Sequence, residues 1–265
     1  MRKIIFLLCT VTLFFVACNK EEDDSSPVTP DAPSDTTQVD PPIDGWIPQA
    51  VTDIDGNVYD AVQIGDHVWM VQNLRTTRYA NGDDIPAGSM DSYSEPYRYV
   101  PDNDEGNVPN YGYLYNWPAV MHGAASSNTN PSEVQGICPD GWHVPSDAEW
   151  TQLTDFVSAQ SQFQCNSNSS NIAKALAGTM GWNSSTITCA VGNTPSDNNT
   201  TGFSGLPAGY YDGNYGGFGD NANFWSATKL DNSHAHRRSL RYSSASVSRT
   251  SPTLHYSLSV RCVRD

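Results

Sequence analysis

The stretch from Cys138 to Trp150 constrains the fold of this chain most, because three structural signals lie close together in it. Its Pro-Asp-Gly run is typical of a turn, and the Trp-His-Val that follows is typical of a short strand. Ser146 and Glu149 then have the spacing of a capping box, in which each side chain satisfies a free amide at a helix start. The stretch therefore predicts a turn, a strand and a helix beginning after Ser146.

The apolar residues after the capping box predict a helix with one buried side. Trp150, Leu153 and Val157 recur at helical spacing and define a buried stripe. A second helix is expected over residues 170–176, before the glycine at position 178. The chain contains 20 Gly and 17 Pro, which indicates a fold with many turns rather than a helical bundle.

Alternating residues predict strands near both ends of the domain. Residues 61–74 alternate around a turn at Gly65-Asp66. Trp69 is expected on the face opposite to the core candidates, which are Val62, Ile64, Val68 and Met70.

The end of the chain, residues 257–265, predicts a strand that pairs with the Cys138 region. Leu258, Val260 and Cys262 alternate inward in this pattern. Arg261 is therefore expected to face outward with the flanking polar residues.

The charge of the chain, −15, is unevenly distributed. Residues 46–228 hold 19 acidic and 4 basic side chains, whereas residues 229–265 hold one Lys and six Arg against two Asp. The acidic part argues against nucleic acid as a partner, because phosphate binding needs a basic surface. An anionic ligand could use the basic tail, but we expect its arginines to pair with acids of the same domain.

Residues 1–17 predict export from a bacterial cell. Arg2-Lys3 precedes the apolar run 4–16, which is too short to span a bilayer comfortably. The run ends in Val-Ala-Cys18, which resembles a lipobox. By that resemblance the chain is cut before Cys18, which then carries lipid. Ordinary signal cleavage, leaving a free Cys18 thiol, is the alternative.

Residues 18–45 are predicted to be a lipidated cysteine followed by a disordered, acidic and proline-rich tether. Lys20 and the acidic run 21–24 resemble a surface-export signal, although a solvated charge cluster would look the same. The Pro, Ser, Thr and Asp that follow cannot offset the entropy of ordering. We expect an outer-membrane lipoprotein exposed at the cell surface, held to the membrane by its lipid anchor, with one domain over residues 46–265.

Several motifs then occur in a fixed order along the domain. They are Asp53-Ile-Asp-Gly-Asn-Val-Tyr, Gln63-Ile-Gly, Gly112-Tyr-Leu-Tyr-Asn-Trp, Cys138-Pro-Asp-Gly-Trp-His-Val-Pro-Ser, Phe203-Ser-Gly-Leu-Pro-Ala-Gly, Phe224-Trp-Ser-Ala-Thr and Val260-Arg-Cys-Val-Arg-Asp. As a set they resemble the Fibrobacter succinogenes major paralogous domain over about residues 50–265. That family is found mostly in secreted proteins and lipoproteins.

The resemblance implies an α+β domain with a C-type-lectin-like fold, which formylglycine-generating enzymes share. Its features are a short twisted antiparallel sheet, two helices and long irregular loops. Calcium-dependent sugar binding is not implied, because Ser226-Ala227 stand where such lectins have Asn-Asp after the comparable tryptophan. No cofactor is predicted. An acidic loop at Asp102, Asp104 and Glu105 leaves calcium open but unsupported.

Four cysteines remain in the domain, and export places them in an oxidising compartment. Three pairings are open; we predict Cys138–Cys262 and Cys165–Cys189. The alternative is a reactive pair of Cys165 and Cys189, with copper, as in a formylglycine-type oxidase. Neither has a cationic neighbour in sequence to lower its pKa, which favours structural disulfides.

The predicted function is a non-catalytic binding module for glycan or protein. The glycine-aromatic segment 202–228 is its candidate surface, because aromatic faces beside Asn and Asp suit sugars. The candidate ligand-binding residues are Tyr210, Tyr211, Asp212, Asn214, Tyr215, Asp220, Asn223 and Trp225.

Two other functions stay open: an oxidase or other enzyme, and a structural envelope protein without a discrete ligand. His234 and His236 could place two imidazoles on one strand face, but no third metal ligand lies nearby in sequence. No metal ligand and no catalytic residue is therefore predicted.

Overall fold

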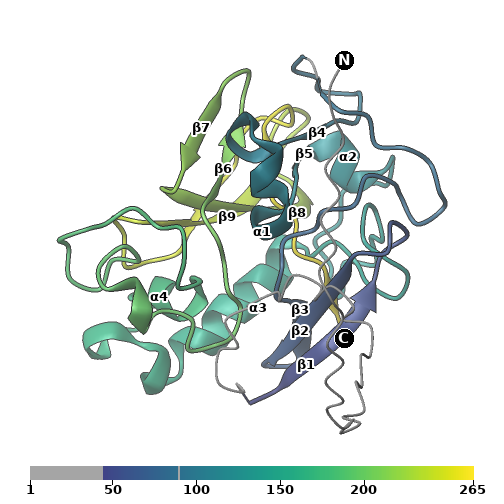
Figure 1. Cartoon of the computed structure of the whole chain (residues 1–265). Coiled ribbons are helices and arrows are strands. Elements are labelled where there is room, and N and C mark those ends of the chain that lie inside the picture. Colours follow the sequence, from purple (N-terminus) through teal and green to yellow (C-terminus); the bar gives the residue numbers. More distant parts are fainter. Residues whose placement is uncertain (1–43, 89) are drawn as a thin grey trace, which may run out of the picture. The chain divides into compact units, whose positions relative to one another are not determined.

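The computed structural model describes residues 44–88 and 90–265 of the chain. Residues 1–17, Cys18 and most of the tether lie outside the described residues. The described part is rich in antiparallel sheet and has few helices (Figure 1). No helix within it is long and apolar enough to cross a membrane.

The helices are short except for one. They are α1 (Val108–Tyr111), α2 (Trp117–Met121), α3 (Asp147–Ser158) and α4 (Ala173–Leu176). The strands are β1 (Trp46–Thr52), β2 (Val58–Ile64), β3 (His67–Met70), β4 (Arg98–Tyr99), β5 (Leu114–Asn116), β6 (Ala208–Tyr211), β7 (Tyr215–Phe218), β8 (Asn221–Lys229), β9 (Ala235–Arg241), β10 (Ser248–Thr250), β11 (Ser257–Leu258) and β12 (Val263–Arg264).

The strands of the described region form three antiparallel sheets, in the orders β1-β2-β3-β12, β10-β9-β8 and β4-β5-β11-β6-β7. The expected final strand is divided between two of them, with β11 in the third sheet and β12 in the first. Between these strands, Ser259 bonds to Asn223 and Trp225 of β8 through backbone groups. The C-terminal segment therefore connects all three sheets.

The β2–β3 hairpin corrects the prediction for Trp69. Val62 pairs with Trp69 across the hairpin, and side chains of directly paired residues lie on the same face. Trp69 therefore shares a core with Val62 and Ile64, whereas Met70 packs into a second core on the other face. Both faces of this sheet are covered, so the alternation does not separate core from solvent.

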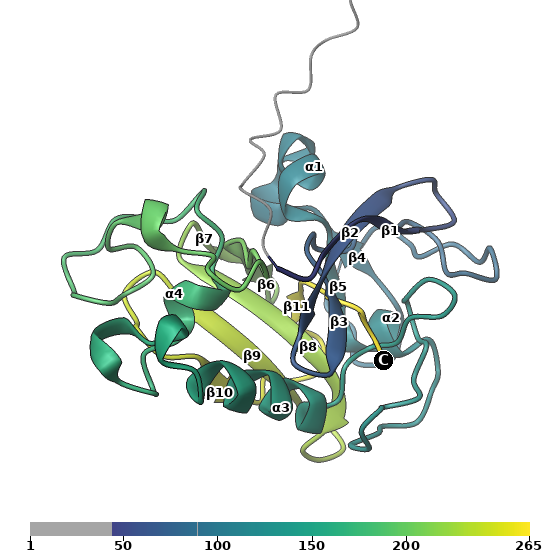
Figure 2. The same ribbon diagram turned by 90° about the horizontal axis from the view of Figure 1, so that it is seen from below.

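The helix predicted after Ser146 is confirmed as α3. Ser146 Oγ accepts a hydrogen bond from the Glu149 amide at 3.1 Å, and Glu149 Oε2 accepts one from the Ser146 amide at 2.8 Å. Trp150, Leu153 and Val157 are buried as expected, and α3 lies along the sheet of β8 and β9 (Figure 2). The second predicted helix is shorter, because it begins only at Ala173.

Both predicted disulfides are confirmed. Cys138 and Cys262 are joined with an S–S distance of 2.01 Å, and Cys165 and Cys189 with one of 2.08 Å. The first is fully buried and ties the entry to α3 to the C-terminal segment. The second joins two loops and leaves Cys165 half-buried.

Arg261 is fully buried, so the prediction that it faces outward is wrong. Its guanidinium donates to Asn73 Oδ1 at 2.7 Å and to the carbonyls of Met70, Phe203 and Ser204. The aromatic rings of Phe203 and Phe224 lie 4.8 and 5.4 Å from its centre. The segment between β11 and β12 runs through the interior, where both of its faces are covered.

Two arginines of the basic tail pair with one buried acid, as expected. Arg238 and Arg249 both bond to the carboxylate of Asp147 at the start of α3. Burial alone would raise the pKa of this carboxyl, but the hydrogen bonds from Arg249 and Arg238 outweigh it and hold the pKa below its ordinary value. The ion pairs join β9 and β10 to α3.

Candidate functional site

Four tyrosines from two distant parts of the chain meet on the sheet that contains β6 and β7. They are Tyr97 and Tyr99 around β4, Tyr211 at the end of β6 and Tyr215 at the start of β7. The β6–β7 hairpin places its two tyrosines directly opposite each other, since Tyr211 pairs with Tyr215. We call these four residues the tyrosine surface; the hairpin that carries two of them is at the upper left of Figure 1.

The rings of the tyrosine surface form a connected series. Tyr99 and Tyr211 are stacked with centroids 4.1 Å apart, and Tyr211 and Tyr215 are 4.9 Å apart. Tyr99 is buried, with its hydroxyl donating to the carbonyl of Met90 at 2.6 Å. Tyr97, Tyr211 and Tyr215 are half-buried. A buried ring thus supports others that remain partly accessible.

The electrostatics of the tyrosine surface favour neutral phenols. Burial, reinforced by the carboxylates of Asp91 and Asp212, raises the pKa of Tyr211. Burial and the neighbouring Tyr211 and Glu105 likewise raise the pKa of Tyr215. At neutral pH these hydroxyls are uncharged donors and acceptors beside acidic oxygens. Such a surface suits a neutral ligand with many hydroxyl groups better than an anion.

Tyr210 lies on the opposite face of β6 from the tyrosine surface, because successive strand side chains alternate. Its ring is 5.8 Å from that of Tyr256 and packs against the larger core. The segment predicted as one binding surface is therefore divided by the pleat of the strand.

The remaining predicted ligand residues occupy different environments. Asp212 and Asn214 form the turn between β6 and β7, beside the tyrosine surface. Asp220 lies in the next turn and accepts a hydrogen bond from Asn183 at 2.9 Å.

Asn223 and Trp225 lie inside the protein. Asn223 bonds to Gly209 and Ser239, and the Trp225 indole donates to the Tyr115 carbonyl at 2.9 Å. These two side chains have 2% and 0% exposure, which removes them from any surface for a ligand. Strand β8 is buried along most of its length and contributes to both cores, so its polar and aromatic side chains make their contacts inside the protein.

Tyr97 and Tyr99 were not among the predicted site residues. The segment around them is visibly aromatic in sequence, but its contact with β6 depends on tertiary structure.

With this geometry in place, the comparisons with known proteins assign a family. The model of the Fibrobacter succinogenes major domain matches residues 62–264. The chain belongs to this family. Searches of curated proteins and of solved structures each found no match. The matched range includes the whole tyrosine surface and both disulfides.

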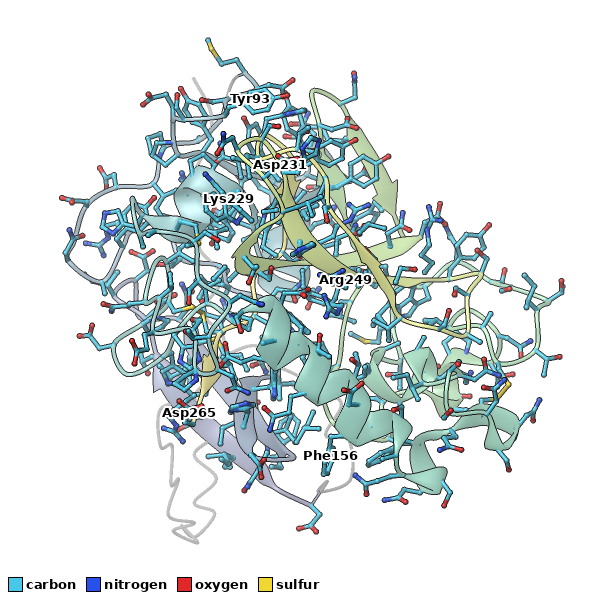
Figure 3. All side chains as sticks on the ribbon, turned by 180° about the vertical axis from the view of Figure 1, so that it is seen from behind. Tyr93, Phe156, Lys229, Asp231, Arg249 and Asp265 are labelled. Carbon is cyan, nitrogen blue, oxygen red and sulfur yellow. A yellow bond between two sulfur atoms is a disulfide. The ribbon has the colours of Figure 1, made fainter. Side chains whose placement is uncertain are left out.

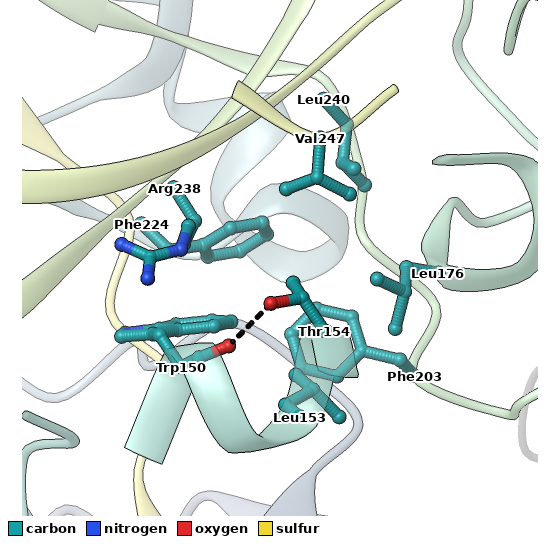
Figure 4. A pocket seen from close by; sticks show the side chains of 9 residues that line it. All are labelled: Trp150, Leu153, Thr154, Leu176, Phe203, Phe224, Arg238, Leu240 and Val247. Carbon is teal, nitrogen blue, oxygen red and sulfur yellow. Dashed lines mark hydrogen bonds between the residues drawn. The ribbon is translucent and has the colours of Figure 1, made fainter. Parts of the chain in front are cut away.

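A small apolar pocket in this Fibrobacter succinogenes major domain lies between α3 and the β8–β9 strands, away from the tyrosine surface (Figure 4). Trp150, Leu153, Phe203 and Phe224 line it, and Arg238 stands at its edge. Its volume of about 10 Å³ holds about one water molecule. Because its walls are core residues, we assign it to packing.

The two histidines of the His-x-His motif have separate partners in this domain. His234 Nδ1 lies 2.9 Å from an Asp231 carboxylate oxygen, and His236 Nδ1 lies 2.7 Å from Ser251 Oγ. Neither belongs to a group of three metal-ligating side chains within the described residues. The acidic loop Asp102–Glu105 is not in such a group either.

Proposed function

We propose that this domain is a non-catalytic module that binds glycans through the tyrosine surface. The observation that carries the proposal is the continuous series of rings from buried Tyr99 to the partly accessible Tyr211 and Tyr215, bordered by acids. Aromatic rings pack against the C–H faces of sugars, while phenol and carboxylate oxygens bond to sugar hydroxyls. Tyrosine also contributes large contact area at a low cost in conformational entropy.

Replacing Tyr211 or Tyr215 by alanine is expected to weaken glycan binding at least tenfold, or about 1.4 kcal/mol. Each change removes a partly accessible ring, and Tyr211→Ala also uncovers the buried Tyr99 that stacks on it. The measurement is a glycan array with the full chain, followed by titration calorimetry with the best ligand.

The matched control is Tyr210→Ala, a change of the same residue type at the neighbouring position on the opposite face of β6. Its affinity should stay within about twofold of the unchanged protein. Equal losses in all three variants would point to general destabilisation. No bound glycan, or binding indifferent to Tyr211 and Tyr215, would reject the site. Capture of a defined protein by the same surface is the alternative outcome.

We also propose that the domain is held at the outer surface of the outer membrane by lipid on Cys18. The support is the lipobox-like sequence and the acidic run that follows it. Cells fed a labelled fatty acid should yield a labelled protein, and Cys18→Ser should abolish the label. A Cys18→Ser protein that remains labelled would reject this anchor.

The fold proposal is a C-type-lectin-like arrangement. Its support is the antiparallel sheet, the α3 helix and the disulfide that joins the entry of α3 to the C-terminal segment. An experimental structure whose strand order differed from that arrangement would reject it.

A further inference from the structure

Three metal-ligating side chains from distant parts of the chain converge at one edge of the first sheet. His67 begins β3, and Asp265 follows β12, which pairs with β3 in a register that places Asp265 opposite His67. Glu149 comes from the first turn of α3. One ligand atom from each residue lies within 4.8 Å of the other two. Asp265 stands at this edge in Figure 3.

The hydrogen bonds around His67 determine which ring nitrogen is free. Gln152 donates through its amide nitrogen to Asp66 Oδ2 at 2.9 Å, so its oxygen is the atom that faces His67. That oxygen lies 2.9 Å from His67 Nε2 and can only accept, so Nε2 carries a proton. In the neutral ring Nδ1 then has a bare lone pair, the form in which imidazole binds metals.

The His67 Nδ1 atom is buried and makes no hydrogen bond within the described residues. Asp265 Oδ1 nevertheless lies 2.9 Å from it. A carboxylate oxygen and a nitrogen lone pair repel at that distance unless a second proton or a metal ion lies between them. A bridging proton would be shared only by His67 Nδ1 and Asp265 Oδ1. The carboxylate of Glu149 places a third acceptor close to these two atoms, which favours a metal ion.

Glu149 has one acceptor position left for a metal. Its carboxylate is fully buried and accepts from the amides of Ser132 and Ser146 and from His143 Nε2, the last at 2.6 Å. A carboxylate has about four acceptor positions, so these three bonds fix its orientation and leave one position open. His143 thereby acts as an outer partner that orients the ligand.

From these contacts we infer a binding site for one divalent transition-metal ion, of the Zn²⁺ type, formed by His67 Nδ1, Glu149 and Asp265. Imidazole nitrogen with carboxylate oxygen is a ligand set that Zn²⁺ accepts at about 2.0–2.2 Å, whereas Ca²⁺ takes oxygen ligands only. Two carboxylates balance the charge of the ion. Asp265, with a half-exposed side chain, can close the remaining distance and gives the ion a path from solvent. The site is separate from the tyrosine surface and does not depend on glycan binding.

The test is calorimetric titration of the full chain with ZnCl₂, with CaCl₂ as a second arm. One Zn²⁺ per chain is expected, with no saturable Ca²⁺ binding at this site. Asp265→Asn should weaken Zn²⁺ binding at least tenfold, and His67→Gln should do the same. With free Zn²⁺ about 100-fold above Kd, the unchanged protein should melt about 5–10 °C higher, and Asp265→Asn should lose most of that shift.

The control is His234→Gln, since His234 is also 2.9 Å from an aspartate but has no third ligand among residues 44–88 and 90–265. This variant should bind Zn²⁺ as the unchanged protein does. If His67→Gln fails to fold, the Zn²⁺ affinity of Asp265→Asn, a change at an exposed side chain, tests the site alone. X-ray absorption at the bound zinc should show nitrogen and oxygen ligands. No saturable binding, sulfur ligands, a loss in His234→Gln, or unchanged affinity in Asp265→Asn would overturn the site.

Discussion

Replacing Arg261 by methionine is expected to lower the free energy of unfolding by about 3–5 kcal/mol. The guanidinium donates to four oxygens from two separate segments, residues 70–73 and residues 203–204. Methionine fills much of the volume between Phe203 and Phe224 but leaves those acceptors without a donor. Burial lowers the pKa of Arg261 to about 9, so the group is still charged at neutral pH. Urea denaturation of the two proteins measures the difference.

Arg264→Met in the same C-terminal segment is the control for Arg261→Met. Arg264 is only partly buried and stacks over Trp142 at 5.0 Å, a contact worth about 0.5–1 kcal/mol. Arg261→Lys should fall in between, because an ammonium has three donors and cannot reproduce the planar fork. A loss below about 1 kcal/mol in Arg261→Met would show that the network contributes little to stability.

Removing the Cys138–Cys262 disulfide is expected to cost about 5 kcal/mol, more than removing Cys165–Cys189, at about 3.5 kcal/mol. The cross-link limits the entropy of the unfolded chain, and the two sequence separations are 124 and 24 residues. The double variants Cys138→Ala/Cys262→Ala and Cys165→Ala/Cys189→Ala compare the two bonds by denaturant unfolding.

Burial is a second reason to expect a larger loss of stability from removing Cys138–Cys262 than from removing Cys165–Cys189. Cys138 and Cys262 are both fully buried, so alanine there also leaves unfilled space, whereas Cys165 is partly exposed. Equal destabilisation by the two pairs, or a larger effect from Cys165–Cys189, would contradict the loop-entropy reasoning. Intact mass before and after alkylation confirms that the other disulfide stays closed in each variant.

The sequence was most informative where structure depends on neighbouring residues. The capping box of Ser146 and Glu149 and the apolar stripe of α3 follow from backbone amides and helical spacing, which are local properties. The same residues did not indicate that Glu149 faces His67 and Asp265, because those positions are brought together only by the pairing of β12 with β3.

Alternation was a weaker guide to which side chains are buried. It assumes that a strand has one solvent-exposed face and one buried face. In this protein the first sheet and the C-terminal segment are covered on both faces. That is why Trp69 and Arg261 are buried where the pattern predicted otherwise. The alternating pattern correctly predicted that Leu258, Val260 and Cys262 are buried. Their side chains are buried whether one face of the segment is covered or both faces are.

For the candidate site too, some features follow from local sequence and others from the packing of distant segments. The family resemblance, the abundance of aromatic residues in segment 202–228 and the start of the main helix can all be read from the order of the amino acids. The packing of distant segments brings Tyr211 and Tyr215 next to Tyr97 and Tyr99 and places Trp225 in the core. The physical reason is that turns, caps and helical stripes depend on contacts within a few residues. The accessible surface depends on which distant segments pack together, and the C-terminal segment that joins all three sheets sets much of that packing.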